Sequence, residues 1–121
     1  MAIKLPIIVP VLPTADLQRD LEWYSAKTGF KPLFVHDMYA GIRRGDLTIH
    51  LQWHADTEDD PLLGGSVIKI FVDDVQSIFD EFVALGTVPQ DKLRRNTPWN
   101  THEFGFYDLN KNAIFFVQGA D

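Results

Sequence analysis

The chain has 121 residues, of which 45% are hydrophobic and 12% aromatic, and it contains no cysteine. This length and composition predict one globular domain and exclude disulfides and thiolate metal sites, and no apolar run reaches the roughly 18 residues that a membrane helix needs. We therefore expect a cytoplasmic protein without a membrane partner. The formal net charge of −6 repels phosphate backbones, so we expect no nucleic-acid partner.

The first half of the chain predicts a strand, a helix and three further strands. Residues 3–12 are β-branched and interrupted by prolines that exclude a helix, so they predict a strand at a sheet edge. A helix follows over residues 14–29, because apolar residues recur at helical spacing, with Thr14 or Asp16 as its cap and Gly29 as its end. Three strand-like pieces then follow, at residues 30–37, 38–45 and 46–54.

A second pattern of the same kind follows an acidic stretch, residues 55–65, that ends in two glycines. It consists of a strand (66–72), a helix (73–86) that Asp73 or Asp74 caps, a connector containing proline, and two more strands (103–108 and 113–118). We therefore expect a single domain over residues 1–121, made of two modules, about 1–55 and 65–121, with residues 55–65 as the linker. Two sheets of this kind would enclose a concave space that suits a ligand.

The four histidines of the chain do not form a metal-binding motif. His50 and His54 are four residues apart on a predicted strand, which places them about 13 Å apart and too far to share one metal ion. The serines lie in no nucleophile elbow, and the one Gly-Gly pair is not a phosphate loop. The residues alone therefore predict no catalytic residue, no metal site and no cofactor.

Three positions have features that favour contact with a small ligand. His50 shares the polar face of an alternating strand, so it contacts the ligand if that face lines the cavity, and it is otherwise a solvated surface residue. Trp99 follows Pro98 outside any alternating strand, and an aromatic ring on a proline-stiffened loop stacks well on planar or cationic ligands. Glu103 begins the strand beside this loop.

Taken together, these segments resemble the vicinal-oxygen-chelate superfamily of glyoxalase I, extradiol dioxygenases and bleomycin resistance proteins, and the bleomycin-binding branch most closely. The resemblance rests on the repeated element order and on three short patterns: an aromatic pair before Gly-Phe (Trp23, Tyr24, Gly29, Phe30), Tyr-Ala-Gly at 39–41, and Pro-Trp (98–99) ahead of Glu-Phe (103–104) and an Asp-x-Asn turn (108–110). It implies an α+β fold of two βαβββ modules that form a cupped mixed sheet. It also implies a homodimer whose N-terminal strand is exchanged, with Pro10 as the hinge.

The same resemblance bears on catalysis. Enzymes of this superfamily hold a divalent metal with four ligands, and the matching positions here are Val9, His50, Val67 and Phe115. Three of these four side chains cannot coordinate a metal, whereas a catalytic site needs about three protein ligands. The resemblance therefore implies a binding protein rather than an enzyme.

The implied function is sequestration of a bleomycin-type glycopeptide, which is cationic and carries planar bithiazole rings, or of a similar small molecule. The acidic net charge suits a cationic ligand, and Trp99 would stack on a planar aromatic one. The expected ligand-binding residues, at clefts between two protomers, are Phe34, Tyr39, His50, Trp99, His102 and Glu103. Two alternatives remain open: a metal-dependent glyoxalase- or dioxygenase-type enzyme that uses His50, His102 or Glu103, and a binder of an unrelated metabolite.

Overall fold

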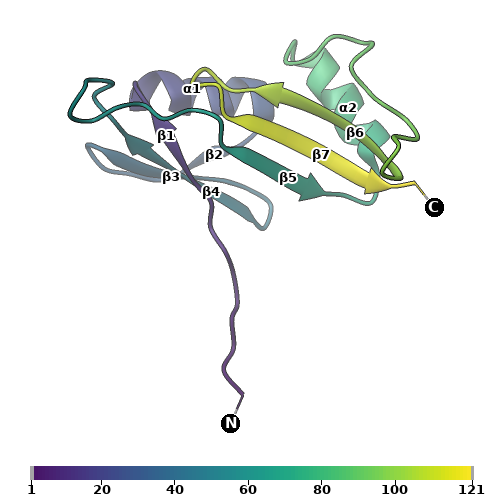
Figure 1. Cartoon of the computed structure of the whole chain (residues 1–121), viewed down its shortest axis with the longest axis horizontal. Coiled ribbons are helices and arrows are strands. Elements are labelled where there is room, and N and C mark those ends of the chain that lie inside the picture. Colours follow the sequence, from purple (N-terminus) through teal and green to yellow (C-terminus); the bar gives the residue numbers. More distant parts are fainter. Residues whose placement is uncertain (1, 121) are drawn as a thin grey trace.

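The computed structural model describes residues 2–120, so Met1 and Asp121, the ends of the expected domain, lie outside the described residues. The first half contains β1 (Val11–Thr14), α1 (Leu17–Thr28), β2 (Lys31–Val35), β3 (Tyr39–Arg44) and β4 (Leu47–Trp53). The second half contains β5 (Val67–Phe71), α2 (Val75–Ala84), β6 (Thr101–Tyr107) and β7 (Ala113–Gly119). Figure 1 shows this order along the chain.

The strands form two sheets, which confirms the predicted α+β class. The first sheet has the order β1-β4-β3-β2 and the second has the order β5-β7-β6, and in each sheet the strand before the helix pairs in parallel with the last strand of its half. One expected strand is missing from the described part of the second half, where a single bridge between Arg94 and Glu103 stands in its place. The connector contains Pro89 and Pro98, which cannot donate to a strand ladder.

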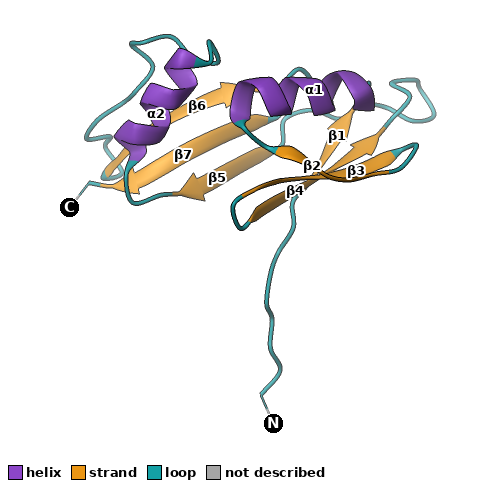
Figure 2. Ribbon diagram, turned by 180° about the vertical axis from the view of Figure 1, so that it is seen from behind, coloured by secondary structure: helices purple, strands orange, loops and turns teal. Residues whose placement is uncertain are grey.

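The N-terminal segment differs from the prediction of a strand over residues 3–12. Strand β1 begins only at Val11, and residues 2–10 form an extended arm that belongs to none of the described strands. The carbonyl of Pro10 accepts a hydrogen bond from the backbone N–H of His50 at 2.9 Å, which is where the arm joins the first sheet. Figures 1 and 2 show the arm leaving the sheets on the side opposite to the helices.

Local signals fix both helices. The Asp16 side chain accepts the N–H of Arg19 at the start of α1, and Gly29 ends it with a φ of 75°. The Asp74 side chain accepts the N–H of Ser77 in the same way at the start of α2. A side-chain acceptor for the unpaired N–H groups of the first turn, and a residue that tolerates a left-handed backbone at the end, are what helix ends require.

Both helices lie on the same side of the two sheets (Figure 2) and cover one continuous core. Tyr24 of α1 and Phe82 of α2 are fully buried, and Phe104 and Phe116 lie beneath α2 with ring centroids 5.5 Å apart. In the first sheet, buried Ile49 and Leu51 alternate with half-buried His50 on β4. Each sheet therefore buries one face under its helix and leaves the other face open.

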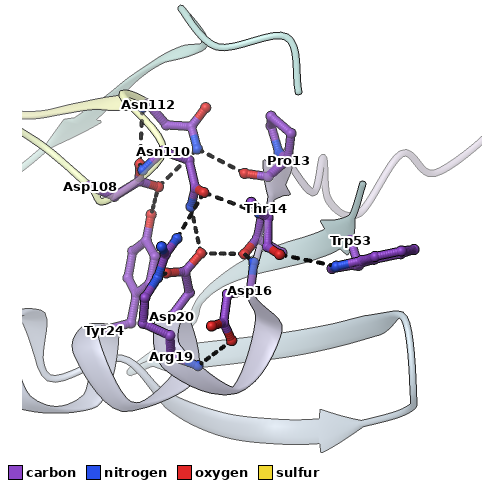
Figure 3. Close-up of polar contacts among 11 residues, drawn as sticks. Pro13, Thr14, Asp16, Arg19, Asp20, Tyr24, Trp53, Asp108, Asn110 and Asn112 are labelled. Atoms are coloured by element: carbon purple, nitrogen blue, oxygen red, sulfur yellow. Dashed lines mark hydrogen bonds and ion pairs between the residues drawn. The ribbon is translucent and has the colours of Figure 1, made fainter. Parts of the chain in front are cut away.

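A buried polar network ties α1 to the turn between β6 and β7 (Figure 3). The Tyr24 hydroxyl donates to Asp108 at 2.6 Å, and Asn112 donates to the same carboxylate at 2.8 Å. Asn110 and the Thr14 hydroxyl donate to Asp20, which joins the end of β1 to the same network. Because each of these residues is less than a tenth exposed, water cannot replace a lost partner.

Ionic and polar contacts hold the two halves together at the other end of α1. The Arg44 guanidinium, at the end of β3, donates to Glu81 of α2 at 2.7 Å and to the carbonyl of Thr28 at 2.8 Å. Lys27 donates to the carbonyl of Leu85, just beyond α2, at 3.2 Å. The two halves are thus fixed relative to one another at both ends of α1.

Burial, together with the Asp108 charge, raises the pKa of Tyr24 well above its usual value, so its hydroxyl keeps the proton that it donates. We predict that Tyr24→Phe lowers the free energy of unfolding by about 1.5–3 kcal/mol, the range for a hydrogen bond to a charged group. The measurement is urea denaturation. Tyr107→Phe is the control, since Tyr107 is 70% exposed, and equal losses in the two variants would contradict the prediction.

Candidate functional site

Three of the expected ligand-binding residues meet on the open face of the first sheet. Phe34 lies on β2, Tyr39 on β3 and His50 on β4, and each is half-buried. Gly41 of β3 is the register partner of both Phe34 and His50, so Phe34, Gly41 and His50 lie in one row across the sheet. Tyr39 is two residues before Gly41 on the same strand and points to the same face. We call the surface formed by Phe34, Tyr39 and His50 the first face.

The geometry of the first face depends on Gly41. A Cβ atom on this glycine would lie 2.3 Å from the Phe34 ring, so only glycine lets that ring lie across β3. The Phe34 and Tyr39 rings are nearly parallel, at 15°, while the His50 ring stands at 88° to Phe34 and 81° to Tyr39. The Tyr39 hydroxyl and His50 Nδ1 are 2.8 Å apart. The face therefore combines two aromatic rings with a fixed imidazole.

A second group forms around Trp99, before β6 on the other sheet. The backbone N–H of Thr97 donates to the carbonyl of Thr101 at 2.9 Å, which closes a tight turn that carries Trp99. The Trp99 indole N–H donates to Glu103, and the Arg94 guanidinium lies 5.1 Å from the ring centroid. The ring is thereby held in place although the residue is 52% exposed.

A cavity of about 590 Å³ opens beside this turn, over the open face of the second sheet. Arg94 and Glu103, the two residues that contact Trp99, line it together with Phe115 of β7. A Cβ on Gly105 would lie 2.5 Å from the Phe115 ring, so Phe115 lies over Gly105 as Phe34 lies over Gly41. We call the surface formed by Trp99, Glu103 and Phe115 the second face.

Glu103 stays ionised at this position. Its burial raises the pKa, but hydrogen bonds from Thr101 and Trp99 and the positive charges of Lys69 and Arg94 outweigh burial and lower the pKa below the usual value. Thr101 donates to the carboxylate at 2.7 Å. The negative charge of the buried carboxylate is thus stabilised by these donors and positive charges.

The remaining sequence-based candidates lie apart from the two faces. His102 follows Thr101 on β6 and so faces away from Glu103, and its Nδ1 accepts the N–H of Asn96 at 3.0 Å. Of the positions that match metal ligands of the family, Val9 lies in the arm, His50 on the first face, and Val67 and Phe115 on the second sheet. Within residues 2–120 no three His, Asp or Glu side chains form a group that could hold a metal ion. No helix in this range has the length and apolar character to cross a membrane.

Sequence reasoning overlooked Arg94 and the two glycine–aromatic pairs. A glycine inside a strand pattern marks a close approach, and Gly41 and Gly105 both follow that rule. Arg94 carried no comparable signal, because its contact with Trp99 depends on how the connector folds back beside β6.

The sequence model of the Glyoxalase/Bleomycin resistance protein/Dioxygenase superfamily matches residues 6–116. A bleomycin resistance protein of Geobacillus stearothermophilus is 23% identical over 91% of this chain and 94% of its own length.

Solved structures share the fold. A bleomycin resistance determinant encoded on the transposon Tn5 superposes with a TM-score of 0.78 at 18% identity, over 95% of this chain and 98% of the other. A bleomycin-binding protein from bleomycin-producing Streptomyces verticillus, complexed with copper(II)-bleomycin, superposes with a TM-score of 0.75 at 24% identity, over 98% and 99%.

The lowered pKa of Glu103 gives a pH prediction. Its contribution to stability is present above the unfolded pKa of about 4.3 and is lost as the pH falls through the lower folded value. We expect the indole N–H signal of Trp99, followed by ¹H–¹⁵N NMR, to titrate with a midpoint below about 4.3. Glu103→Gln should abolish this titration, and a midpoint above the usual glutamate value would refute the prediction.

Proposed function

The chain belongs to the Glyoxalase/Bleomycin resistance protein/Dioxygenase superfamily, as its sequence predicted, and we propose that it is a non-enzymatic protein that sequesters a small molecule. The proposed ligand is a bleomycin-type glycopeptide or a similar molecule with planar aromatic rings. The observation that carries the proposal is Trp99, a half-exposed indole fixed by Glu103 and Arg94 beside a 590 Å³ cavity that Phe115 lines.

The two faces suit planar rings. A side chain that is already held by hydrogen-bond and cation–π contacts loses little freedom when it stacks on a ligand, and so more of the stacking energy contributes to affinity. Trp99 on the second face meets this condition through Glu103 and Arg94. On the first face, the absence of a side chain on Gly41 leaves the space in which the Phe34 ring lies across β3. The net charge of −6 accelerates encounter with a cationic ligand.

Sequestration rather than catalysis is favoured by the side chains at the metal positions of the family. Val9, Val67 and Phe115 offer no ligand atom, which leaves His50 as a single imidazole where a catalytic metal needs about three protein ligands. A purified protein that carries stoichiometric zinc, nickel, iron or manganese would favour the enzymatic alternative instead.

We further infer that the protein is a homodimer in which the arm, residues 2–10, packs on the partner. Ile3, Leu5, Ile7 and Ile8 are between 74% and 96% exposed in the single chain. Covering several neighbouring apolar side chains with a partner removes them from water, which lowers the free energy of the complex. The arm leaves on the open side of the sheets (Figure 1), which is the side where a partner would complete a cleft with the two faces. Pro10 is then the hinge of the exchange.

The ligand proposal predicts that metal-free bleomycin quenches tryptophan fluorescence saturably at micromolar concentration. Trp99→Ala should weaken binding about fivefold or more, since an aromatic pair contributes about 1 kcal/mol beyond its buried area. The affinity of this variant is measured by calorimetry, because its remaining tryptophans, Trp23 and Trp53, do not report on the site. The control is Trp53→Phe, because the Trp53 indole donates to the carbonyl of Ala15 at 3.1 Å and is engaged away from both faces. Unchanged affinity in Trp99→Ala would contradict the role of Trp99, and no binding to the unaltered chain would favour an unrelated metabolite.

The dimer proposal predicts that deletion of residues 2–9 converts a dimer into a monomer in sedimentation velocity. Those residues contribute mostly exposed side chains in the single chain, so their removal should leave the fold of the remainder intact. Lys4→Gln, which keeps the apolar residues of the arm, serves as the control and should remain dimeric. A truncated chain that still sediments as a dimer would rule out exchange through the arm.

A further inference from the structure

We propose that Tyr39 is a positioning residue that fixes His50 as its Nε2–H tautomer, so that the first face presents a hydrogen-bond donor to the ligand. The chemical class that this selects is a planar heteroaromatic ring with an acceptor, a ring nitrogen or a carbonyl oxygen, at its edge. The tautomer stands on the geometry of the free protein, whereas the ligand class rests on the proposed function.

The hydrogen bond between Tyr39 and His50 has a preferred direction. The two atoms, Oη and Nδ1, are 2.8 Å apart, and either could donate in principle. A phenolic hydroxyl is a stronger donor than a neutral imidazole N–H, and an imidazole lone pair is a stronger acceptor than a phenolic oxygen. The Tyr39 hydroxyl therefore donates to Nδ1, and the proton of the neutral ring is on Nε2.

The other ring nitrogen of His50, Nε2, is open to a ligand. Among the described residues, the one buried side-chain nitrogen or oxygen that lacks a hydrogen-bond partner is Oδ1 of Asn112. Nε2 of His50 has no hydrogen-bond partner within residues 2–120 and is not among the buried unpartnered atoms, so it is accessible to solvent. A donor that is fixed in direction and open to solvent is available to a ligand.

The imidazole ring of His50 cannot rotate freely. Its ring contacts Phe34 at 5.2 Å and Tyr39 at 5.3 Å between centroids, nearly perpendicular to both. Phe34 is itself held across β3 by the absence of a side chain on Gly41. A planar ligand stacked on Phe34 is thus adjacent to a donor of fixed position, and a ring that offers only C–H groups there leaves that donor without a partner.

Protonation of His50 would not alter this property. In the imidazolium form both nitrogens donate, so Nε2 remains a donor while Nδ1–H turns toward the Tyr39 oxygen. The charged and titratable groups on the strands that flank His50 are Tyr39, Arg43 and Arg44 of β3, and β1, on the other side, contributes none. Both the neutral ring and the imidazolium therefore present a donor at Nε2.

The tautomer is tested without any ligand, by long-range ¹H–¹⁵N correlation of the histidine side chains in the full chain at a pH where His50 is neutral. His102 provides an internal reference, because its Nδ1 accepts a backbone N–H and its proton must then be on Nε2. We expect His50 to show the same pattern of ¹⁵N shifts as His102, and Tyr39→Phe to shift His50, but not His102, toward a mixture of tautomers. An Nδ1–H pattern in the unaltered chain, or no response to Tyr39→Phe, would overturn the proposal.

The ligand class is tested with two neutral probes of the same shape, 2,2′-bithiazole and 2,2′-bithiophene, of which only the first carries ring-nitrogen acceptors. We expect bithiazole to bind about three- to tenfold more tightly in an NMR titration, the worth of one neutral hydrogen bond. The ratio should fall toward one in His50→Ala and to an intermediate value in Tyr39→Phe.

Each result of the probe titration has a distinct meaning. Equal affinities for the two probes in the unaltered chain would overturn the ligand class while planar-ligand binding stands. Failure of both probes to bind would refute the ligand class together with the proposed function, and the tautomer measurement would still decide the role of Tyr39.

Discussion

One-sided burial is the constraint on which the rest of the structure depends. Both helices pack on the same side of the two sheets, and residues from both halves, such as Tyr24 and Phe82, share one core there. A sheet residue that points away from the helices can contact only neighbours on its own face, solvent, or another molecule. This is why half-buried aromatic residues such as Phe34 and Phe115 collect on the open faces, and why glycines in register beneath them are needed to let the rings lie flat.

Polar contacts at both ends of α1 make this arrangement rigid. A carboxylate such as Asp108 is costly to bury, and it is tolerated because Tyr24 and Asn112 donate to it. At the opposite end, Arg44 bridges α2 and the last turn of α1. Apolar packing alone permits the two halves to slide, whereas hydrogen bonds of fixed direction do not. The relative position of the two open faces is therefore set by side chains far from either face.

Local signals predicted the local structure, and long-range contacts are where sequence reasoning stopped. The helices, their Asp16 and Gly29 ends and the alternation around His50 depend on residues a few positions apart, so the pattern was sufficient. The arm was expected to be a strand because its residues favour extended backbone, but a strand needs a partner, which the described chain does not offer. In the same way, nothing local to Trp99 indicated that Arg94 would lie against its ring.

The arm also bears on how the chain avoids self-association during synthesis. A run of β-branched residues without a partner is the kind of segment that stacks into intermolecular β-structure. Pro6 and Pro10 each remove a backbone donor from this run, and Lys4 adds a charge, which disfavours a continuous ladder between copies of the arm. These prolines thus lower the tendency of newly made chains to aggregate through the arm.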